Sequence, residues 1–319
     1  MNMYLPFLRG KLFEFKAIKE FIEESYNGEY GCHIMPIIEP VKKDRKPMMA
    51  CVEAMGKAKM PFAIVLNSRM GDYQRKTFEI ENFLAEEKMK AVTEWIPAFE
   101  VNGNANVEDI ERAVDDYDFK NVMLIFLYGV DLNDEKVSRL ISNQKVAFVA
   151  VLNLGQSPVM RRKLAAMQKQ LIAIEDRFVD QPSNNAYRPN IDEFFTDTFG
   201  YYKSDYNMFG FSDFTALAKN YREGGVLPQV VAIHLTYQKN EDEVYVHHFL
   251  SDTRNGSDDI RNEFEEAKNK IMPFFNGKST TMAIRQIVSG GYPGLGAIKK
   301  FSIKNHLELM NRILHEKED

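Results

Sequence analysis

Eight short apolar runs recur along the chain and constrain its fold more than any other feature of the sequence. Each run is apolar throughout instead of alternating, which is typical of parallel strands buried on both faces. Segments with helical periodicity lie between most of these runs, so strand and helix alternate. The predicted strands are 33–40, 61–68, 95–101, 122–128, 146–153, 171–177, 208–215 and 230–237.

The spacing and number of the runs favour a barrel over an open sheet. The runs begin roughly 25 to 35 residues apart, which is the length of one βα unit. Eight such units close a (β/α)8 barrel, whereas a doubly wound sheet usually stops at five or six strands. No Gly-x-Gly-x-x-Gly follows the first run, so the fingerprint of a dinucleotide site is missing. We therefore predict an α/β fold, a TIM-type barrel that spans residues 1–319 as one domain.

The remaining segments are interpreted as helices and additions to this barrel. Residues 1–30, with a helix over 12–24, are predicted to cap it, and 256–319 to form a helical extension. Segment 243–250 alternates like a strand and is predicted to form a β-hairpin with 230–237. The predicted helices are 46–59, 73–92, 107–117, 134–142, 158–168, a segment near 191–202, 258–275, 281–288 and 297–314.

Composition excludes several classes of protein. A formal net charge of −5 gives no reason to expect a nucleic-acid partner. The longest apolar runs are far shorter than the ~20 residues that cross a bilayer, and no apolar signal segment follows the N-terminus, so no membrane partner is expected. The two cysteines, Cys32 and Cys51, have no metal-ligand or redox spacing. We expect a cytoplasmic protein.

Polar residues at the ends of the runs are the candidate functional residues, because the carboxyl ends of barrel strands converge on one mouth. Carboxylates gathered there repel one another, which raises some of their pKa values or recruits a cation. The first outcome suits acid–base hydrolysis without a cofactor, and the second suits metal-assisted hydrolysis with Mg²⁺ or Mn²⁺ as the cation. The sequence does not decide between them. The predicted catalytic residues are Glu39, Glu100, Asp176 and Asp213. The predicted substrate-binding residues are Arg9, Lys11, Asn67, Asn153, Arg177, His234 and Tyr237.

Each of these residues also has a structural interpretation. Glu39, Asn67 and Glu100 can satisfy backbone amides where a strand meets the next helix. His234 lies in an apolar run, where a core histidine is common. The sequence Arg9-Gly10-Lys11 can be a tight turn, with Glu14 stabilising the start of the first helix.

Four short segments of the chain resemble the beta-protein family of bacteria and phages: YLPFLRGK at 4–11 with Glu14, PIIEPV at 36–41, SDY at 204–206 and GFSDF at 210–214. This resemblance implies a barrel without an established reaction, carried in mobile or defence gene neighbourhoods beside a second protein. It marks a set of positions and assigns them no chemistry: Arg9, Lys11, Glu14, Glu39, Asp205 and Asp213.

Two hypotheses about function follow. The first is a hydrolase that acts on a phosphate ester or another anionic substrate through the carboxylates of the mouth. The second is a non-catalytic binding or assembly subunit of a defence or mobile-element system, with a protein partner encoded nearby. In the second hypothesis the aromatic residues of segment 194–211 anchor the partner.

Overall fold

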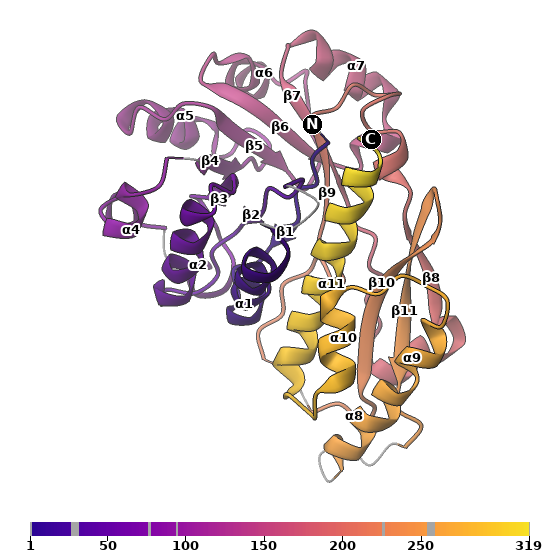
Figure 1. The fold of residues 1–319 in the computed structure, drawn as a ribbon. Helices are drawn as coiled ribbons and strands as arrows, with labels where there is room; N and C mark the ends of the chain where they lie inside the picture. The colour runs from indigo at the N-terminus through magenta and orange to yellow at the C-terminus, as the bar shows by residue number, and fades with distance from the viewer. Residues whose placement is uncertain are drawn as a thin grey trace.

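The computed structural model describes residues 2–26, 32–75, 78–93, 95–224, 227–253 and 259–318. Its main sheet has eight strands in the order β1-β2-β3-β4-β5-β6-β7-β9, and neighbouring strands are parallel (Figure 1). The strands are β1 (Phe7–Leu8), β2 (Ile37–Ile38), β3 (Phe62–Val65), β4 (Trp95–Glu100), β5 (Val122–Phe126), β6 (Val146–Leu152), β7 (Gln170–Glu175) and β9 (Gly210–Asp213).

The two edges of this sheet meet just before β1. Tyr4 forms parallel bridges with Ile34 on one side and with Phe211 of β9 on the other. The amide of Leu5 donates to the carbonyl of Phe211 at 2.8 Å. Glycine is required at 210, because a Cβ there would stand 2.8 Å from the carbonyl oxygen of Met3. The sheet is therefore a nearly closed eight-stranded barrel, as the TIM-type prediction requires.

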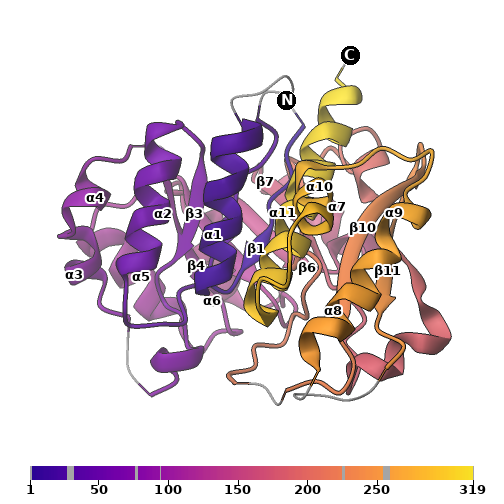
Figure 2. The same ribbon diagram turned by 60° about the horizontal axis from the view of Figure 1, so that its bottom comes forward.

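Helices flank the barrel and cover its outer surface (Figure 2). Each of the six connections from β1 to β7 carries an α-helix, and the amphipathic faces of these helices pack on the outer side of the strands. These helices are α1 (Leu12–Phe21), α2 (Lys46–Lys57), α3 (Ile80–Leu84), α4 (Glu87–Lys90), α5 (Val107–Asp116), α6 (Glu135–Ser142) and α7 (Pro158–Ala166). A π-helix (Ile22–Tyr26) extends α1, and 3-10 helices lie at Gly71–Tyr73, Leu154–Gln156, Asn184–Asn190 and Thr198–Gly200.

A second, antiparallel sheet stands beside the barrel (Figure 1). Its strands, in the order β10-β11-β8, are β10 (Ala232–Asn240), β11 (Glu243–Leu250) and β8 (Asp192–Thr196). The last helix contacts both α1 and β10 and so joins this sheet to the barrel. The helices of this region are α8 (Ile260–Asn269), α9 (Ile271–Phe274), α10 (Met282–Ser289) and α11 (Leu295–Glu316).

The structure corrects four predictions of secondary structure. Segment 230–237 is not a barrel strand: it belongs to β10, whose apolar run arises because helices cover both of its faces. The eighth barrel strand is β1, within the segment predicted as a cap, and its two residues are too few to give a pattern. The helix predicted near 191–202 is β8 followed by a 3-10 helix, and segment 73–92 forms short separate helices. Among the described residues, no helix is long and apolar enough to span a membrane.

Candidate active site

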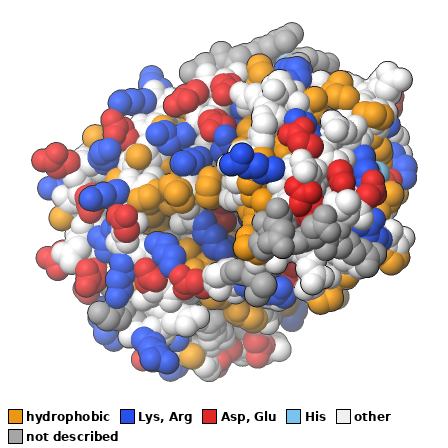
Figure 3. Space-filling model, turned by 90° about the horizontal axis from the view of Figure 1, so that it is seen from below, with side chains coloured by type: hydrophobic (Ala, Val, Ile, Leu, Met, Phe, Trp, Pro, Cys, Tyr) orange, Lys and Arg blue, Asp and Glu red, His pale blue; other side chains and the backbone are white. Residues whose placement is uncertain are grey.

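Alternation along the barrel strands decides which side chains reach the mouth. One apolar cluster gathers every second residue of the strands, including Phe7 and Ile37, and so fills the interior. Arg9 lies two residues after Phe7, and Glu39 lies two residues after Ile37. Glu100 lies two residues after Ala98, which also belongs to the interior cluster. These three side chains therefore point inward at the carboxyl end. Figure 3 looks onto this end and shows a hollow near its centre with Lys and Arg side chains around it.

Arg9 and Glu39 form a buried ion pair. The Nη1 of Arg9 donates to Oε2 of Glu39, whose side chain is fully buried. The hydroxyl of Ser68 donates to the other carboxylate oxygen at 3.0 Å. The Nη2 of Arg9 donates to the carbonyl of Lys219 at 2.7 Å, whereas its Nε has no partner. Both oxygens of Glu39 are thus occupied, and one donor of Arg9 is free.

Glu100 ends β4 beside this pair and is only 6% exposed. Its backbone is fixed by Asn67, which accepts from the amide and donates to the carbonyl, both at 2.8 Å. Asn106 also donates to this carbonyl at 2.8 Å. The side-chain Oε1 of Glu100 is buried and has no hydrogen-bond partner among the residues that the structure describes.

Burial and a neighbouring charge change the acidity of Glu100. Loss of hydration raises the pKa of its carboxyl to about 7, and the charge of Glu39 acts in the same direction. Arg9 and Arg69 lower that pKa by less. The mouth therefore holds one carboxyl group that exchanges its proton near neutral pH and has an oxygen left for a ligand.

The prediction that Asp213 faces the mouth is wrong. Its side chain lies on the same face of β9 as Phe211, which packs under the helices. Oδ1 of Asp213 accepts from the hydroxyl of Tyr4 at 2.5 Å and from the amide of Thr215 at 2.7 Å. Oδ2 lies 3.4 Å from Nε2 of His306 on α11. Asp213 therefore ties β9 to the last helix.

Other predicted residues lie on the rim of the mouth and already have partners. The carboxylate of Asp176 pairs with Lys219 at 3.2 Å. The Nζ of Lys11 donates to the carbonyl of Arg222 at 3.0 Å, and burial lowers the pKa of this lysine. The backbone amide of Lys11 donates to the carboxylate of Glu14 at 3.3 Å. This hydrogen bond fits the structural interpretation of the turn, in which Glu14 stabilises the start of the first helix.

Among the described residues, no contact joins Arg177 or Asn153 to Glu100. Arg177 donates to both oxygens of Glu175, at 2.9 and 2.7 Å. Asn153 is exposed and adopts a left-handed backbone with φ 57°. Its amide donates to the carbonyl of Ile174 at 2.8 Å, so it serves the strand-to-loop turn.

The prediction that His234 and Tyr237 lie at the barrel mouth is also wrong, because both belong to β10 in the second sheet. The Nδ1 of His234 lies 2.6 Å from Nδ1 of His248. The hydroxyl of Tyr237 donates to the carboxylate of Asp192 at 2.9 and 3.0 Å. The apolar run that contains them gave no sign of a different sheet.

Sequence reasoning missed two residues that shape the mouth. Ser68 ends a predicted strand, so its position was a signal, yet a hydroxyl was not weighed beside the carboxylates. Lys219 lies in a segment without a motif or periodic pattern, and nothing in the sequence marks it. Within the described part of the chain, no group of three or more His, Cys, Asp and Glu side chains is arranged to hold a metal ion.

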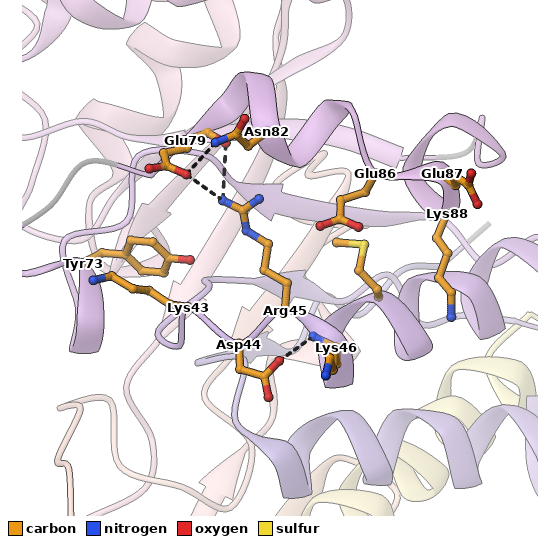
Figure 4. Close-up of a pocket in the computed structure, with 11 residues that line it drawn as sticks. Lys43, Asp44, Arg45, Lys46, Tyr73, Glu79, Asn82, Glu86, Glu87 and Lys88 are labelled. Atoms are coloured by element: carbon orange, nitrogen blue, oxygen red, sulfur yellow. Dashed lines mark hydrogen bonds and ion pairs between the residues drawn. The ribbon is translucent and has the colours of Figure 1, made fainter.

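Two surface pockets lie near the mouth. The smaller, about 550 Å³, is formed by the loops after β4 and β5 and includes the exposed ring of Tyr128. The larger, about 780 Å³, lies between α2 and the helices α3 and α4 (Figure 4). In Figure 4, Arg45 reaches toward Glu79, which also accepts from Asn82. Four basic and four acidic side chains line this larger pocket, so it favours no particular ligand charge: Lys43, Asp44, Arg45, Lys46, Glu79, Glu86, Glu87 and Lys88.

Comparison of the chain with models of protein families, with curated proteins and with solved structures found no match. The resemblance to the beta-protein family therefore stays a prediction. The functional proposal that follows depends on the geometry of the mouth.

Proposed function

We propose that the protein is an enzyme that performs acid–base chemistry on a small anionic substrate at the barrel mouth, and that hydrolysis of a phosphate ester is its reaction. The observation that carries this proposal is the buried carboxyl of Glu100, with one oxygen unpartnered and a pKa of about 7. An acid that titrates near the operating pH can both accept and deliver a proton. Groups with such shifted pKa values are concentrated at active sites.

The three inward side chains divide the work. Glu100 is the general acid or base. Glu39 is held by Arg9 and Ser68, so we assign it to positioning: it orients Arg9 and its charge favours the protonated form of Glu100. The unpartnered Nε of Arg9 is the donor that we assign to an anionic oxygen of the substrate.

The proposal is compatible with a divalent cation bound beside Glu100, and such a cation can be added to the assay. Oxygen ligands from one or two carboxylates, together with substrate phosphates, are the usual protein site of Mg²⁺. Glu100 is the inward carboxylate with an oxygen to spare, whereas both oxygens of Glu39 are engaged. The assay is therefore run with and without Mg²⁺ or Mn²⁺.

The competing proposal of a binding or assembly subunit gains less from the structure. The aromatic residues that suggested it are largely internal, since Phe195, Phe199, Tyr202 and Phe211 are buried. Phe194 is 37% exposed, and Tyr201, Tyr206 and Phe209 are half-buried, so these four rings are the part of the aromatic segment that a partner could reach. A partner protein remains the explanation to pursue if no reaction is found.

A panel of p-nitrophenyl phosphate monoesters and diesters tests the proposal. Glu100→Gln should lower kcat/KM by about 100-fold or more, as expected for the loss of a general acid or base. The wild-type pH profile should bend near pH 7. Glu308→Gln is the matched control, because Glu308 is a buried carboxyl on α11, outside the mouth, and burial raises its pKa too. Equal activity of wild type and Glu100→Gln, at equal folded fraction, would rule out the assignment.

A further inference from the structure

A segment after β9 crosses one half of the mouth. We name residues 218–224 the strap; they contain no helix or strand. The strap contacts the loops after β7, β1 and β2, which are neighbours around the barrel once β9 is included. Its three ion pairs join Lys219 to Asp176 at 3.2 Å, Arg222 to Asp180 at 2.7 Å, and Glu223 to Lys42.

Two backbone carbonyls of the strap accept hydrogen bonds from the two cationic side chains that follow β1. The carbonyl of Lys219 accepts from Arg9, and the carbonyl of Arg222 accepts from Lys11. The ring of Tyr221 lies against Lys11, with Nζ 4.5 Å from the ring centroid. An anionic ligand at the free Nε of Arg9 would compete with the strap for the neighbouring Nη2 and for Nζ of Lys11, because a charged oxygen is a stronger acceptor than a neutral carbonyl.

The base of the strap is strained. Thr215 has a φ of 57°, in the left-handed region that a β-branched residue rarely adopts. Its amide is held there by Asp213, while its own hydroxyl is buried without a partner. Strain of this kind persists where surrounding contacts enforce it, and it is concentrated at segments that switch between states.

From these three observations we propose that the strap is an autoinhibitory segment, which occupies Arg9 and Lys11 in the free protein and is displaced by an anionic substrate. The inference rests on the proposed function, because it regulates the same mouth. Release is favoured by relief of the strained backbone at Thr215 and by the new charged contacts of Arg9 and Lys11. The ion pairs that oppose release are largely exposed, so salt weakens them.

Inorganic phosphate is the probe for displacement. Hydrogen–deuterium exchange of the intact protein should become faster in peptides that cover 218–224 when phosphate is added, against sodium chloride of equal ionic strength. Peptides from α5 and α6, on the far side of the barrel, should not change. Unchanged exchange in the strap at saturating phosphate would overturn the proposal, as would the absence of phosphate binding.

Chemical labelling of Lys11 gives a second readout that does not need catalysis, because its Nζ is held by the carbonyl of Arg222 and the ring of Tyr221. An N-hydroxysuccinimide ester of acetic acid modifies accessible amines, and mass spectrometry locates the product. The double variant Arg222→Gln/Glu223→Gln, which removes two of the strap's ion pairs, should be labelled at Lys11 about tenfold faster, because the open population rises. Arg139→Gln/Glu111→Gln, which removes a surface pair between α5 and α6, is the matched control and should be labelled at the wild-type rate.

Thr215→Gly should act in the opposite direction. Glycine adopts a positive φ without strain, so this variant should favour the closed strap and slow the labelling of Lys11. The proposal requires both opposite shifts, and equal rates in all variants would overturn it. If the shifts occur but Glu100→Gln leaves hydrolysis unchanged, the strap stands and the proposed function fails. If hydrolysis depends on Glu100 but the labelling rates are equal, the reverse holds.

Discussion

Two buried acidic clusters of this molecule look alike in the sequence and differ in the structure. At the β9–α11 contact, Oδ1 of Asp213 accepts from Tyr4 and Thr215, and Oδ2 lies 3.4 Å from Nε2 of His306. At the barrel mouth, Oε1 of Glu100 has no hydrogen-bond partner among the described residues. A buried carboxylate that accepts hydrogen bonds from its neighbours stabilises the fold, whereas one that is left incomplete costs stability and is available for chemistry.

The largest effect on stability is expected at Asp213. Asp213→Ala leaves the Tyr4 hydroxyl and the Thr215 amide without their shared acceptor and removes the carboxylate beside the His306 ring. Removing one member of a buried charged network costs about 3 to 5 kcal/mol, so thermal melts should shift down by several degrees. Asp205→Ala, at an exposed carboxylate, is the control and should melt close to wild type. A wild-type melting temperature for Asp213→Ala would remove the distinction between the clusters.

Glu39→Gln should be the next most damaging change. It leaves the buried Arg9 guanidinium without a countercharge, which we expect to cost about 3 kcal/mol in chemical denaturation. Glu53→Gln breaks exposed ion pairs with Lys57 and Lys88 and should alter stability far less, because solvent screens those charges. The structure thus favours the structural interpretation of Glu39, and an undiminished free energy of unfolding in Glu39→Gln would contradict it.

Glu100→Gln should change stability in the opposite direction, and only above acidic pH. The folded pKa of about 7 lies above the ordinary value of 4.5, so the unfolded chain releases its proton first as pH rises. Wild type therefore loses stability between about pH 4.5 and pH 7, and the loss is complete above the folded pKa. Glutamine removes this cost, so the variant should be more stable by about 3 kcal/mol at pH 8 and equal to wild type at pH 4. A variant less stable than wild type at pH 8 would count against the raised pKa.

The smallest effect is expected in the second sheet. Tyr237→Phe removes the hydrogen bond to Asp192 and should cost about 1 kcal/mol. Because Tyr237 lies in β10, outside the mouth, hydrolysis per folded molecule should not change. A loss of kcat with stability preserved would place this sheet within the active site and break the comparison on which the assignment of the mouth depends.

Local pattern was enough to find seven barrel strands and the two inward carboxylates. Continuous apolar runs mark buried strands wherever they are long, and Glu39 and Glu100 each end such a run. Asp213 was misplaced for a physical reason: both faces of a barrel strand are buried, so the apolar pattern does not say which face is inside. Moving one residue along a strand reverses the direction of the side chain. Only the register that aligns Asp213 with Glu175 and Phe211 with Ala173 resolves this.

The contacts that complete the mouth were beyond prediction for a different reason. Lys219 reaches Arg9 across 210 positions of the chain, through a carbonyl that any residue could supply. The strand β1 has two residues, and its role follows from the bridges of Tyr4 and not from its composition. Such long-range backbone contacts leave no periodic or compositional trace in a single sequence.

The proton affinity of Glu100 in the folded protein tests the central claim most directly. Carboxyl carbons of glutamate, labelled with ¹³C, can be followed by NMR from pH 4 to pH 9, and the resonance missing from Glu100→Gln identifies the residue. We predict a midpoint near pH 7 for this carboxyl in the free protein, with burial and Glu39 as the causes. A midpoint at the ordinary value near 4.5 would show that the mouth does not hold a neutral-pH acid and would contradict the account.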